Sequence, residues 1–599
     1  MMRVWIINFC LLFWGMSEIW AASENIVSPD VLACSTDGKT LWVGNRFSSE
    51  LLKVDSRTLA VKKRIALNAP VTAITVMPDG SLWVSSDGVS GKLYKIDGRS
   101  MKVLGAFDTG YSPSSLLIDS SGKAVWATLR YNNEIRKYDC DKGSLICKIS
   151  VGREPVGAVS FADGRRILVV NNMPEMSALA FPVAAKMDII DTEKSKVIKR
   201  LLLPNGSTDV KSVTTDVTGE YAYVTHLLAR YQLPTNQVDR GWMYTNALTI
   251  VDLKNEKVEA TVLLDTPQKG AANPWQVMVS PDNKEICVAL SGVHEVCRID
   301  REKLHDRLAQ AKQGVAVTPS YNGWENVMND AGMLYGIAQY QPVGGKGIRA
   351  IAMNGKTLYA AGYFSGDIHV AKGDVFDVQR KLGNNMLASA EGRGNMYFHD
   401  ATLGFQGWQS CASCHPNDAR ADGLNWDLLN DGLGNPKNTK SLLLSHRTPP
   451  CMVTGIRANA EIAVRSGLKY ILFAVTPPSV ADDMDAYLRS LKPLPSPHLQ
   501  NGRLSEKANK GKAIFDKDCL SCHSGPYFTD GKLYPVDWAS GTEVGKKMDV
   551  PTLIEVWRTA PYLYDGRCAT MKDMLKVHGP RIRVSEKEIE ELEEYILSL

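Results

Sequence analysis

The sequence predicts a multidomain protein in which an all-β propeller of seven blades precedes an all-α region made of two lobes. Three observations lead to this fold class. A motif of about 42 residues recurs over the first 385 residues. The strand-like rhythm gives way to helical periodicity after Gly383. The pentad Cys-x-x-Cys-His then occurs twice, at residues 411–415 and 519–523.

The first residues have the pattern of an export signal. Arg3 precedes an apolar run of 13 residues, and the small residues between Ala21 and Ser23 suit cleavage. The run is too short for an ordinary membrane span, and no later stretch reaches that length. We expect residues 1–22 to be removed, which leaves a periplasmic chain without a transmembrane span; a retained N-terminal anchor is the alternative.

The repeats account for residues 26–385. Each copy has a turn such as Asp-Gly, a strand rich in aromatic and β-branched residues, and a later strand that ends in Asp. The first four copies begin 42 residues apart, at Asp37, Asp79, Ser121 and Asp163. Four short strands per copy is the size of one propeller blade, and seven blades close a ring without exposed edges. The repeats resemble the YVTN-type seven-bladed propellers. Insertions in the fourth, fifth and sixth blades are expected to thicken a single face.

Composition limits the possible functions. The chain has 599 residues and a net charge of +4, from 69 basic and 65 acidic side chains. This near balance argues against a dedicated nucleic-acid binder. Export makes disulfides possible. Of the 12 cysteines, we expect three pairs to form: Cys140 with Cys147, Cys287 with Cys297 and, more speculatively, Cys451 with Cys568. Cys34 is then a buried free thiol.

The two pentads are typical of c-type haem attachment. In such a site two cysteines form thioethers with the porphyrin and the histidine binds one face of the iron. The residues are Cys411, Cys414 and His415 in the first motif, and Cys519, Cys522 and His523 in the second. The alternative is a zinc site that shares the four cysteines. A Pro-rich joint near residues 491–499 separates a first lobe, 386–495, from a second, 496–599.

Four phrases of this region carry a resemblance to a known family. They are "GNMYFHDATLGFQGWQSCASCH", "PKNTKSLL", "GKAIFDKDCLSCHSGPYFTDG" and "VPTLIEVWRTAPYLYDGRCATMKDML". They resemble the bacterial diheme cytochrome c peroxidases, a family that includes the diheme enzyme that matures methylamine dehydrogenase. The resemblance implies a first haem that reacts with peroxide, a second that relays electrons, and a calcium ion between them. It implies Asn438, Thr559 and Pro561 as calcium ligands.

The same resemblance selects His578 as the second ligand of the relay haem, in preference to Met571 and Met574. The first haem departs from the family, because the loop before Asn438 contains no histidine. The family's glutamate and its inter-haem tryptophan are not identifiable either. Glu461 is the nearest candidate for a catalytic acid, and His446 is a residue that could cap the first iron.

Two functions follow from this arrangement. The first is a diheme oxidoreductase that reduces peroxide or a similar oxidant, or oxidises a protein substrate, at the first haem, with the propeller as a recognition platform. The second is a pure electron-transfer protein with a propeller docking module. In both, a small cytochrome c or a cupredoxin is the expected electron donor. A third possibility makes the propeller the enzyme and the haems its electron outlet, as in quinohaemoprotein dehydrogenases.

Overall fold

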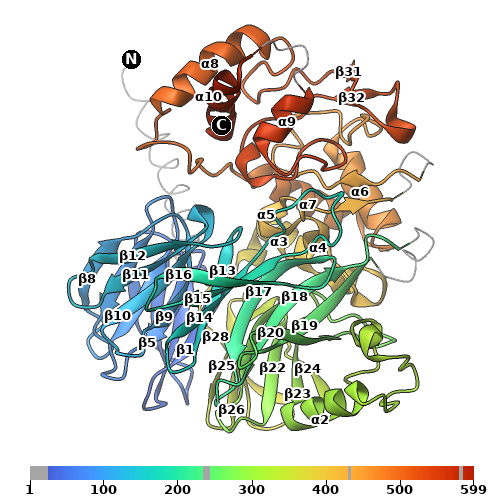
Figure 1. Cartoon of the computed structure of the whole chain (residues 1–599). Coiled ribbons are helices and arrows are strands. Elements are labelled where there is room, and N and C mark those ends of the chain that lie inside the picture. The colour runs from blue at the N-terminus through green and yellow to red at the C-terminus, as the bar shows by residue number, and fades with distance from the viewer. Residues whose placement is uncertain (1–24, 234–242, 429–433, 579–583) are drawn as a thin grey trace, which may run out of the picture.

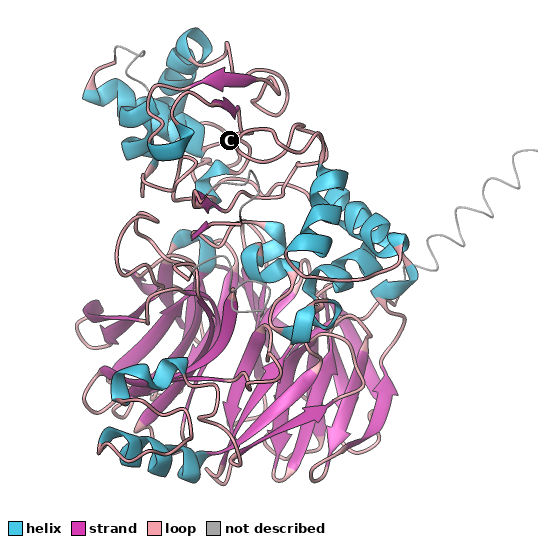
Figure 2. Cartoon of the chain, turned by 90° about the vertical axis from the view of Figure 1, so that its right-hand side faces the viewer, coloured by secondary structure: helices cyan, strands magenta, loops and turns pink. Residues whose placement is uncertain are grey.

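The computed structural model describes residues 25–233, 243–428, 434–578 and 584–599. The expected signal at 1–22 lies outside these residues. A ring of sheets forms the lower part of the molecule, and the C-terminal third lies over one face of the ring (Figure 1). Figure 2 shows the same division, with helices gathered above the strands.

Twenty-eight strands form seven four-stranded antiparallel sheets in simple sequence order. From the axis outward the blades are β1 (Pro29–Cys34), β2 (Thr40–Asn45), β3 (Glu50–Asp55), β4 (Val61–Ala66); β5 (Val71–Val76), β6 (Leu82–Ser86), β7 (Lys92–Ile96), β8 (Val103–Asp108); β9 (Pro113–Ile118), β10 (Ala124–Leu129), β11 (Glu134–Asp139), β12 (Leu145–Ser150); β13 (Pro155–Phe161), β14 (Arg166–Asn171), β15 (Lys186–Asp191), β16 (Lys196–Leu202); β17 (Ser207–Thr215), β18 (Tyr221–Ala229), β19 (Tyr244–Asp252), β20 (Lys257–Leu263); β21 (Pro274–Val279), β22 (Glu285–Leu290), β23 (Glu295–Asp300), β24 (Ala338–Pro342); and β25 (Ile348–Asn354), β26 (Thr357–Gly362), β27 (Asp367–Ala371), β28 (Phe376–Lys381). The predicted seven-bladed propeller is thus confirmed.

The second strand of each blade is buried over nearly its whole length, because it packs between two neighbouring blades. Trp42, Trp83 and Trp126 occupy equivalent places in β2, β6 and β10 and are at most 2% exposed. Separate apolar cores lie between successive blades, and each draws residues from two sheets. Truncation of one such indole would cost about 3–5 kcal/mol of stability. The recurring aromatic residue in the sequence therefore marks the packing between blades.

The ring is closed by the segment before the first blade. Ile26 forms a parallel bridge with Asn384. The Val27 N–H donates to the Asn384 carbonyl at 2.8 Å, and the Asn384 N–H donates to the Asn25 carbonyl at 2.9 Å. The closure satisfies backbone groups that an open edge would leave unpaired. The seam lies directly before the C-terminal region.

The C-terminal region is not all-α, which corrects the sequence-based expectation. Its helices are short and joined by long irregular segments, with two small strand pairs. They are α3 (Ala390–His399), α4 (Cys411–Cys414), α5 (Pro416–Ala419), α6 (Ala460–Tyr470), α7 (Pro478–Ser490), α8 (Glu506–Asp518), α9 (Met571–His578) and α10 (Glu586–Leu597), with β29 (Asn425–Trp426) paired to β30 (Lys437–Asn438) and β31 (Leu533–Pro535) to β32 (Lys547–Asp549). Prolines and glycines interrupt helical periodicity throughout this region, which explains the difference.

The insertions do not all lie on one face. Those of blades four and five join second to third strands and lie on the side of the helical region. The insertion of blade six runs from β23 to β24 and carries α2 (Arg301–Lys312), which lies at the opposite face (Figure 1). Third-to-fourth connections leave a sheet at the end opposite to second-to-third connections. The expected thickening of a single face is therefore wrong for blade six.

The predicted disulfides are absent, since all described cysteines are free thiols. Cys287 is opposite Arg298, whereas Cys297 is opposite Val288. Directly opposed residues share a face of the sheet, so this offset of one residue places the two thiols on opposite faces. Cys140 and Cys147 likewise belong to different cores between blades. Cys568 is buried in the core of the second lobe and is not bonded to Cys451.

In the described parts of the chain, no helix combines the length and apolar character needed to cross a bilayer.

Candidate functional site

The first Cys-x-x-Cys-His motif forms one helical turn, α4, capped by Ser410 and Ser413. The His415 N–H donates to the Cys411 carbonyl at 3.0 Å. Its Nδ1 lies 3.1 Å from the Arg420 carbonyl oxygen. Burial lowers the pKa of His415 to about 4, so the ring is neutral at neutral pH. An imidazole held through Nδ1 presents Nε2 as a metal ligand.

The second motif repeats this geometry at the end of α8. The His523 N–H donates to the Cys519 carbonyl at 3.0 Å, and its Nδ1 lies 3.0 Å from the Phe528 carbonyl oxygen. Burial lowers the pKa of His523 to about 4 as well. In both motifs the carbonyl that holds the ring comes five residues after the histidine. The donor set therefore fits an iron-bound imidazole at each site.

The thiols do not fit the zinc alternative. The described residues contain no group of three or more His, Cys, Asp and Glu side chains that could hold a metal ion, so the two cysteine pairs do not meet. Burial raises the pKa of Cys411 to about 12 and that of Cys519 to about 11. Zinc binds thiolates, which such an environment disfavours. A cysteine that forms a thioether with a porphyrin does not have to remain a thiolate, so the raised pKa values do not argue against haem attachment.

His578, at the end of α9, faces His523. The two ring centres are 6.3 Å apart and the ring planes are at 79°. At this separation His523 and His578 could together hold the iron of a haem. Met571 is buried in the core of the second lobe and Met574 packs against that core. Of the three candidates on this helix, His578 lies where it can oppose His523.

The residues expected to bind calcium lie near one another. The Asn438 N–H donates to the Tyr564 carbonyl at 2.7 Å, which brings Asn438 to the loop that contains Thr559 and Pro561. An arginine from the propeller enters the same loop. Arg153 donates to the carbonyls of Arg558 and Ala560. These carbonyls alternate along the chain with those of Thr559 and Pro561.

The two candidate catalytic residues are both engaged in ion pairs. His446 Nε2 lies 2.9 Å from Asp485, which also accepts from Arg465 at 2.7 Å. Glu461, in the first turn of α6, pairs with Arg489. His446 contributes to lowering the pKa of Glu461, after the N–H and Arg489 hydrogen bonds of that carboxylate. Part of the loop before Asn438, residues 429–433, lies outside the described residues.

The propeller holds the first motif directly, which sequence reasoning missed. Asn273, between blades five and six, donates to Ser410 Oγ at 3.0 Å and accepts from Ser413 Oγ at 2.9 Å. The Asn417 side chain donates to Asn172 of blade four at 2.7 Å. Loop residues of a propeller carry no pattern that reveals such contacts. The only signal was that insertions gather at blades four and five.

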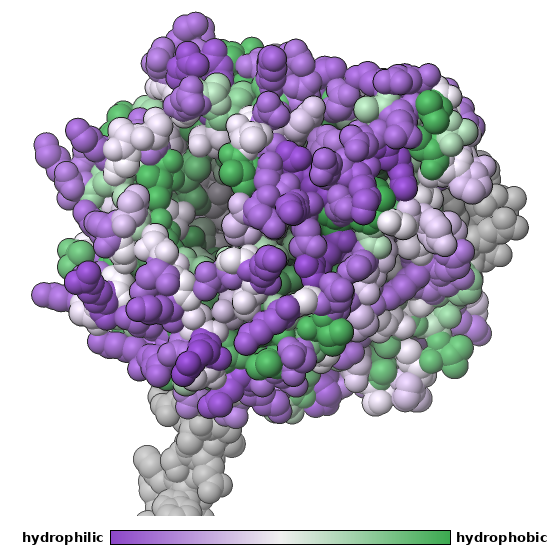
Figure 3. Space-filling model, turned by 90° about the horizontal axis from the view of Figure 1, so that it is seen from below, coloured by the Kyte–Doolittle hydropathy of each residue, from purple (hydrophilic) through white to green (hydrophobic). Residues whose placement is uncertain are grey.

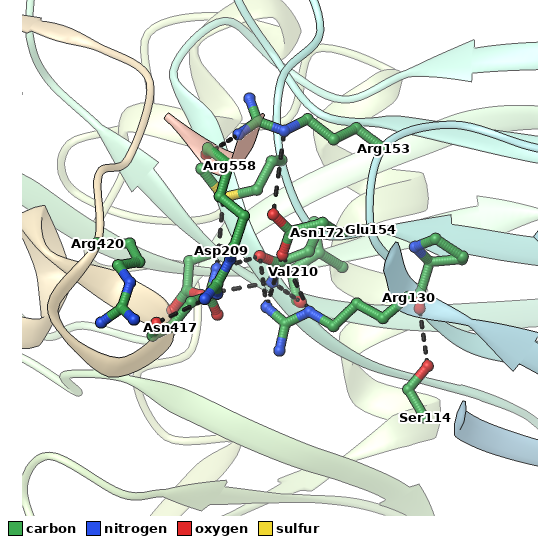
Figure 4. Close-up of polar contacts among 12 residues, drawn as sticks. Ser114, Arg130, Arg153, Glu154, Asn172, Asp209, Val210, Asn417, Arg420 and Arg558 are labelled. Atoms are coloured by element: carbon green, nitrogen blue, oxygen red, sulfur yellow. Dashed lines mark hydrogen bonds and ion pairs between the residues drawn. The ribbon is translucent and has the colours of Figure 1, made fainter. Parts of the chain in front are cut away.

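A buried charge network joins the two lobes. Glu555 accepts from Arg420 at 2.8 and 3.0 Å and from Arg558 at 2.7 Å. Arg558 also donates to the Asn417 carbonyl at 3.4 Å. Figure 4 shows Arg558 and Asn417 turned toward Asn172, Glu154 and Arg130 of the ring. One network thus links the first motif, the second lobe and blades three and four.

Comparison with known proteins supports the ring. No family model matches the chain. It is 25% identical to hydrazine synthase subunit gamma of Kuenenia stuttgartiensis over 34% of this chain and 76% of that protein. It is 24% identical to subunit beta of the same enzyme over 31% of this chain and 46% of that protein, less than half of the subunit's length. The uncharacterized protein YncE of Salmonella typhi is 22% identical over 46% of this chain and 72% of its own.

A solved structure of Kuenenia stuttgartiensis hydrazine synthase matches with a TM-score of 0.51 at 23% identity, over 58% of this chain and 96% of that one. At this identity the match speaks for the fold. The chain is therefore a seven-bladed propeller protein with sequence similarity to subunits of hydrazine synthase.

Proposed function

We propose that the chain is a periplasmic oxidoreductase with two covalently bound c-type haems and a propeller that serves as a recognition platform. Cys411, Cys414 and His415 would hold the first haem. Cys519, Cys522 and His523 would hold the second, with His578 on its opposite face. A c-type haem supplies one-electron exchange at its iron.

The observation that carries this proposal is the matched pair of motif histidines. In each motif a backbone carbonyl five residues on lies 3.0–3.1 Å from Nδ1. This contact fixes the tautomer and directs Nε2 outward. Two independent segments of chain with the same uncommon arrangement speak for the same ligand. The similarity to hydrazine synthase subunits adds support for a role in redox chemistry.

The surroundings of the first motif support an open iron face. Asp485 engages Nε2 of His446, which makes His446 a poor cap for the iron. This favours the peroxidase-type reading, in which a peroxide or similar oxidant binds there. The pairing of Glu461 with Arg489 favours the alternative, a pure electron-transfer protein, because it leaves Glu461 unsuited to move protons.

The second motif is suited to exchange electrons with a partner. Leu520, inside it, is 42% exposed, so a small cytochrome c or cupredoxin could approach closely. We further propose calcium at Asn438, Thr559 and Pro561, although the guanidinium of Arg153 in the same loop would weaken binding of a cation. Dialysis against a chelator should then lower the thermal midpoint, and added Ca²⁺ should restore it.

Haem content tests the cofactor assignment. Purified wild-type protein should contain two haems per chain by pyridine haemochrome and by mass. Changing Cys411→Ala with Cys414→Ala, or Cys519→Ala with Cys522→Ala, should leave one. The matched control is Cys287→Ala with Cys297→Ala, two buried thiols of the ring, which should retain two. A wild-type protein without covalent haem would refute the proposal.

Electron paramagnetic resonance of the ferric protein separates the two functions. A high-spin signal that peroxide consumes supports the enzyme. Two low-spin signals that ignore peroxide support the relay. If His446→Ala converts a low-spin first haem to a high-spin one, then His446 caps the iron and the open-face reading is wrong.

A further inference from the structure

The innermost strand of every blade carries a β-bulge near its start. The residues skipped in the strand registers are Asp30, Thr72, Ser114, Val156, Asp209 to Lys211, Trp275 with Gln276, and Arg349. A bulge re-aims the extra side chain, and bulges are frequent beside active sites. Because the innermost strands surround the axis, these residues form a ring around it. Lys211 of this ring lies 3.5 Å from the Asn417 side chain, close to the first motif.

Three of the bulge residues form one stack. The Lys211 ammonium lies 4.5 Å from the ring centre of Trp275, and the Arg349 guanidinium lies 4.2 Å from it. The same guanidinium lies 3.8 Å from the ring centre of Tyr363. Such stacking engages the faces of a guanidinium. It leaves the N–H groups at the edge to bind another group.

Arg349 lacks a polar partner. Its side chain is only 7% exposed, and it makes no hydrogen bond or ion pair with any residue that the structure describes. Its neighbours differ, since Lys211 pairs with Asp209 at 2.6 Å and Arg46 lies 3.4 Å from Asp87. The Nε of Arg349 is buried without a hydrogen-bond partner, and a buried donor of a charged group is costly to leave unsatisfied. The ring therefore keeps one buried cation whose counter-charge is not among these residues.

Asp418 does not supply that charge. Burial would raise the pKa of this carboxyl, but Arg46, Arg420 and Arg558 lower it to about 2. The charges that lower the pKa of Asp418 are thus those of other guanidinium groups. Protein atoms surround Asp418 closely, yet its surface is accessible to water, so a space enclosed by protein lies beside it, next to the first motif.

We propose that Arg349 is the centre of an anion-binding site at the propeller axis, which takes a small planar carboxylate or oxyanion. The planar fork of a guanidinium matches two oxygens side by side. Such a group could belong to a free anion or to a carboxylate of a prosthetic group in the first lobe. The face of the ring turned away from the helical region is hollowed near its centre (Figure 3). The innermost strands of blades two and three are partly exposed along most of their length, so small molecules can enter the axis beside these blades.

The test is a titration of the full-length protein, as isolated, with sodium formate, against sodium chloride at equal ionic strength. Thermal midpoint and calorimetry are the readouts. The variants are Arg349→Gln, Arg349→Lys, and the control Arg298→Gln, which removes an arginine of blade six that already holds Glu285 at 2.8 and 2.9 Å. We expect saturable stabilisation of wild type and of Arg298→Gln by formate. Arg349→Gln should bind formate about 30-fold more weakly or worse, and Arg349→Lys should fall between.

In chloride alone Arg349→Gln should have an unchanged or higher midpoint, because it removes a desolvated charge; a purely structural arginine would give a lower one. If formate has no effect on wild type, the bound carboxylate belongs to a prosthetic group of the first lobe. In that case Arg349→Gln should still shift the reduction midpoint of one haem, and Arg298→Gln should not. The proposal is overturned if formate acts equally on wild type and Arg349→Gln. It is also overturned if neither formate nor the reduction midpoint responds to Arg349.

Discussion

The two Cys-x-x-Cys-His motifs have the same local backbone but different surroundings. In the first, Ala412 and Ser413 are 4% and 0% exposed, and Asn273 of the ring bonds to both Ser410 and Ser413. In the second, Leu520 is 42% exposed, and the contacts of His523 come from its own lobe. The pentad thus fixes the histidine, while distant residues decide what can reach it. An enclosed site suits chemistry on a small molecule, and an exposed one suits electron exchange with a protein.

The largest effect should come from the charge network that joins the lobes. Glu555→Gln leaves Arg420 and Arg558 buried without a full counter-charge, and loss of one partner of a buried pair costs about 3–5 kcal/mol. Urea unfolding followed by circular dichroism measures it. Glu586→Gln, at an exposed pair with Lys576, should change little. If Glu555→Gln and Glu586→Gln lower the free energy of unfolding equally, the stability of the two lobes does not depend on Glu555.

Asn273→Ala should destabilise the first motif and leave the second motif unchanged. It removes the propeller's bonds to the buried hydroxyls of Ser410 and Ser413, which keep only the capping bonds within α4, and we expect a loss of about 1–3 kcal/mol. Asn283→Ala is the control, because Asn273 and Asn283 have φ of 55° and 62° and the backbone cost is the same. Proteolysis should cut first near the first motif in Asn273→Ala only. An unaltered pattern would show that the lobe itself holds this motif.

Acid should weaken blade five through His226, which is buried in β18. Burial lowers the pKa of His226 to about 4, whereas an unfolded histidine titrates near 6.5. As the pH falls from about 6.5 to about 4, the unfolded chain gains a proton that the folded one refuses, so stability falls by up to about 3 kcal/mol. His226→Gln should lose this component. If the free energies of unfolding of His226→Gln and wild type differ by a constant amount over this pH range, His226 is not the group responsible.

The smallest structural effect should come from His578, whose side chain is exposed. His578→Met and His578→Gly should leave unfolding nearly unchanged. If the protein holds the haems proposed above, its ferric form should lack a sulfur-to-iron charge-transfer band in the near-infrared, and His578→Met should gain one. A band in the unmodified protein that survives in His578→Gly would show that Met571 or Met574 is the ligand.

The sequence predicts features that repeat along the chain better than features that depend on distant pairing. The seven blades could be predicted because turns and strands recur at a regular interval. The two Cys-x-x-Cys-His pentads could be found because each is a contiguous motif of five residues. The predicted disulfide between Cys287 and Cys297 was wrong, because the face of the sheet on which each cysteine lies depends on the register of β22 against β23. The sequence alone does not give that register. The helical region was misjudged because Pro and Gly divide it into short elements. Arg349 was missed, although its bulge occupies the repeat position of Asp30, Thr72 and Ser114.

The seam between Ile26 and Asn384 has a consequence for biogenesis. These residues are at opposite ends of the propeller sequence, so the contact has a very high sequence separation, and such contacts form late and slowly. The ring cannot close until residue 384 has emerged, and the first motif follows within 27 residues of it, since Cys411 is 27 positions after Asn384. The proposed attachment of a haem to Cys411 and Cys414 would have to precede docking on the ring, because docking buries the turn between them. We expect that chains stalled before residue 384 remain open to protease, and that ring closure and maturation of the first lobe compete in time.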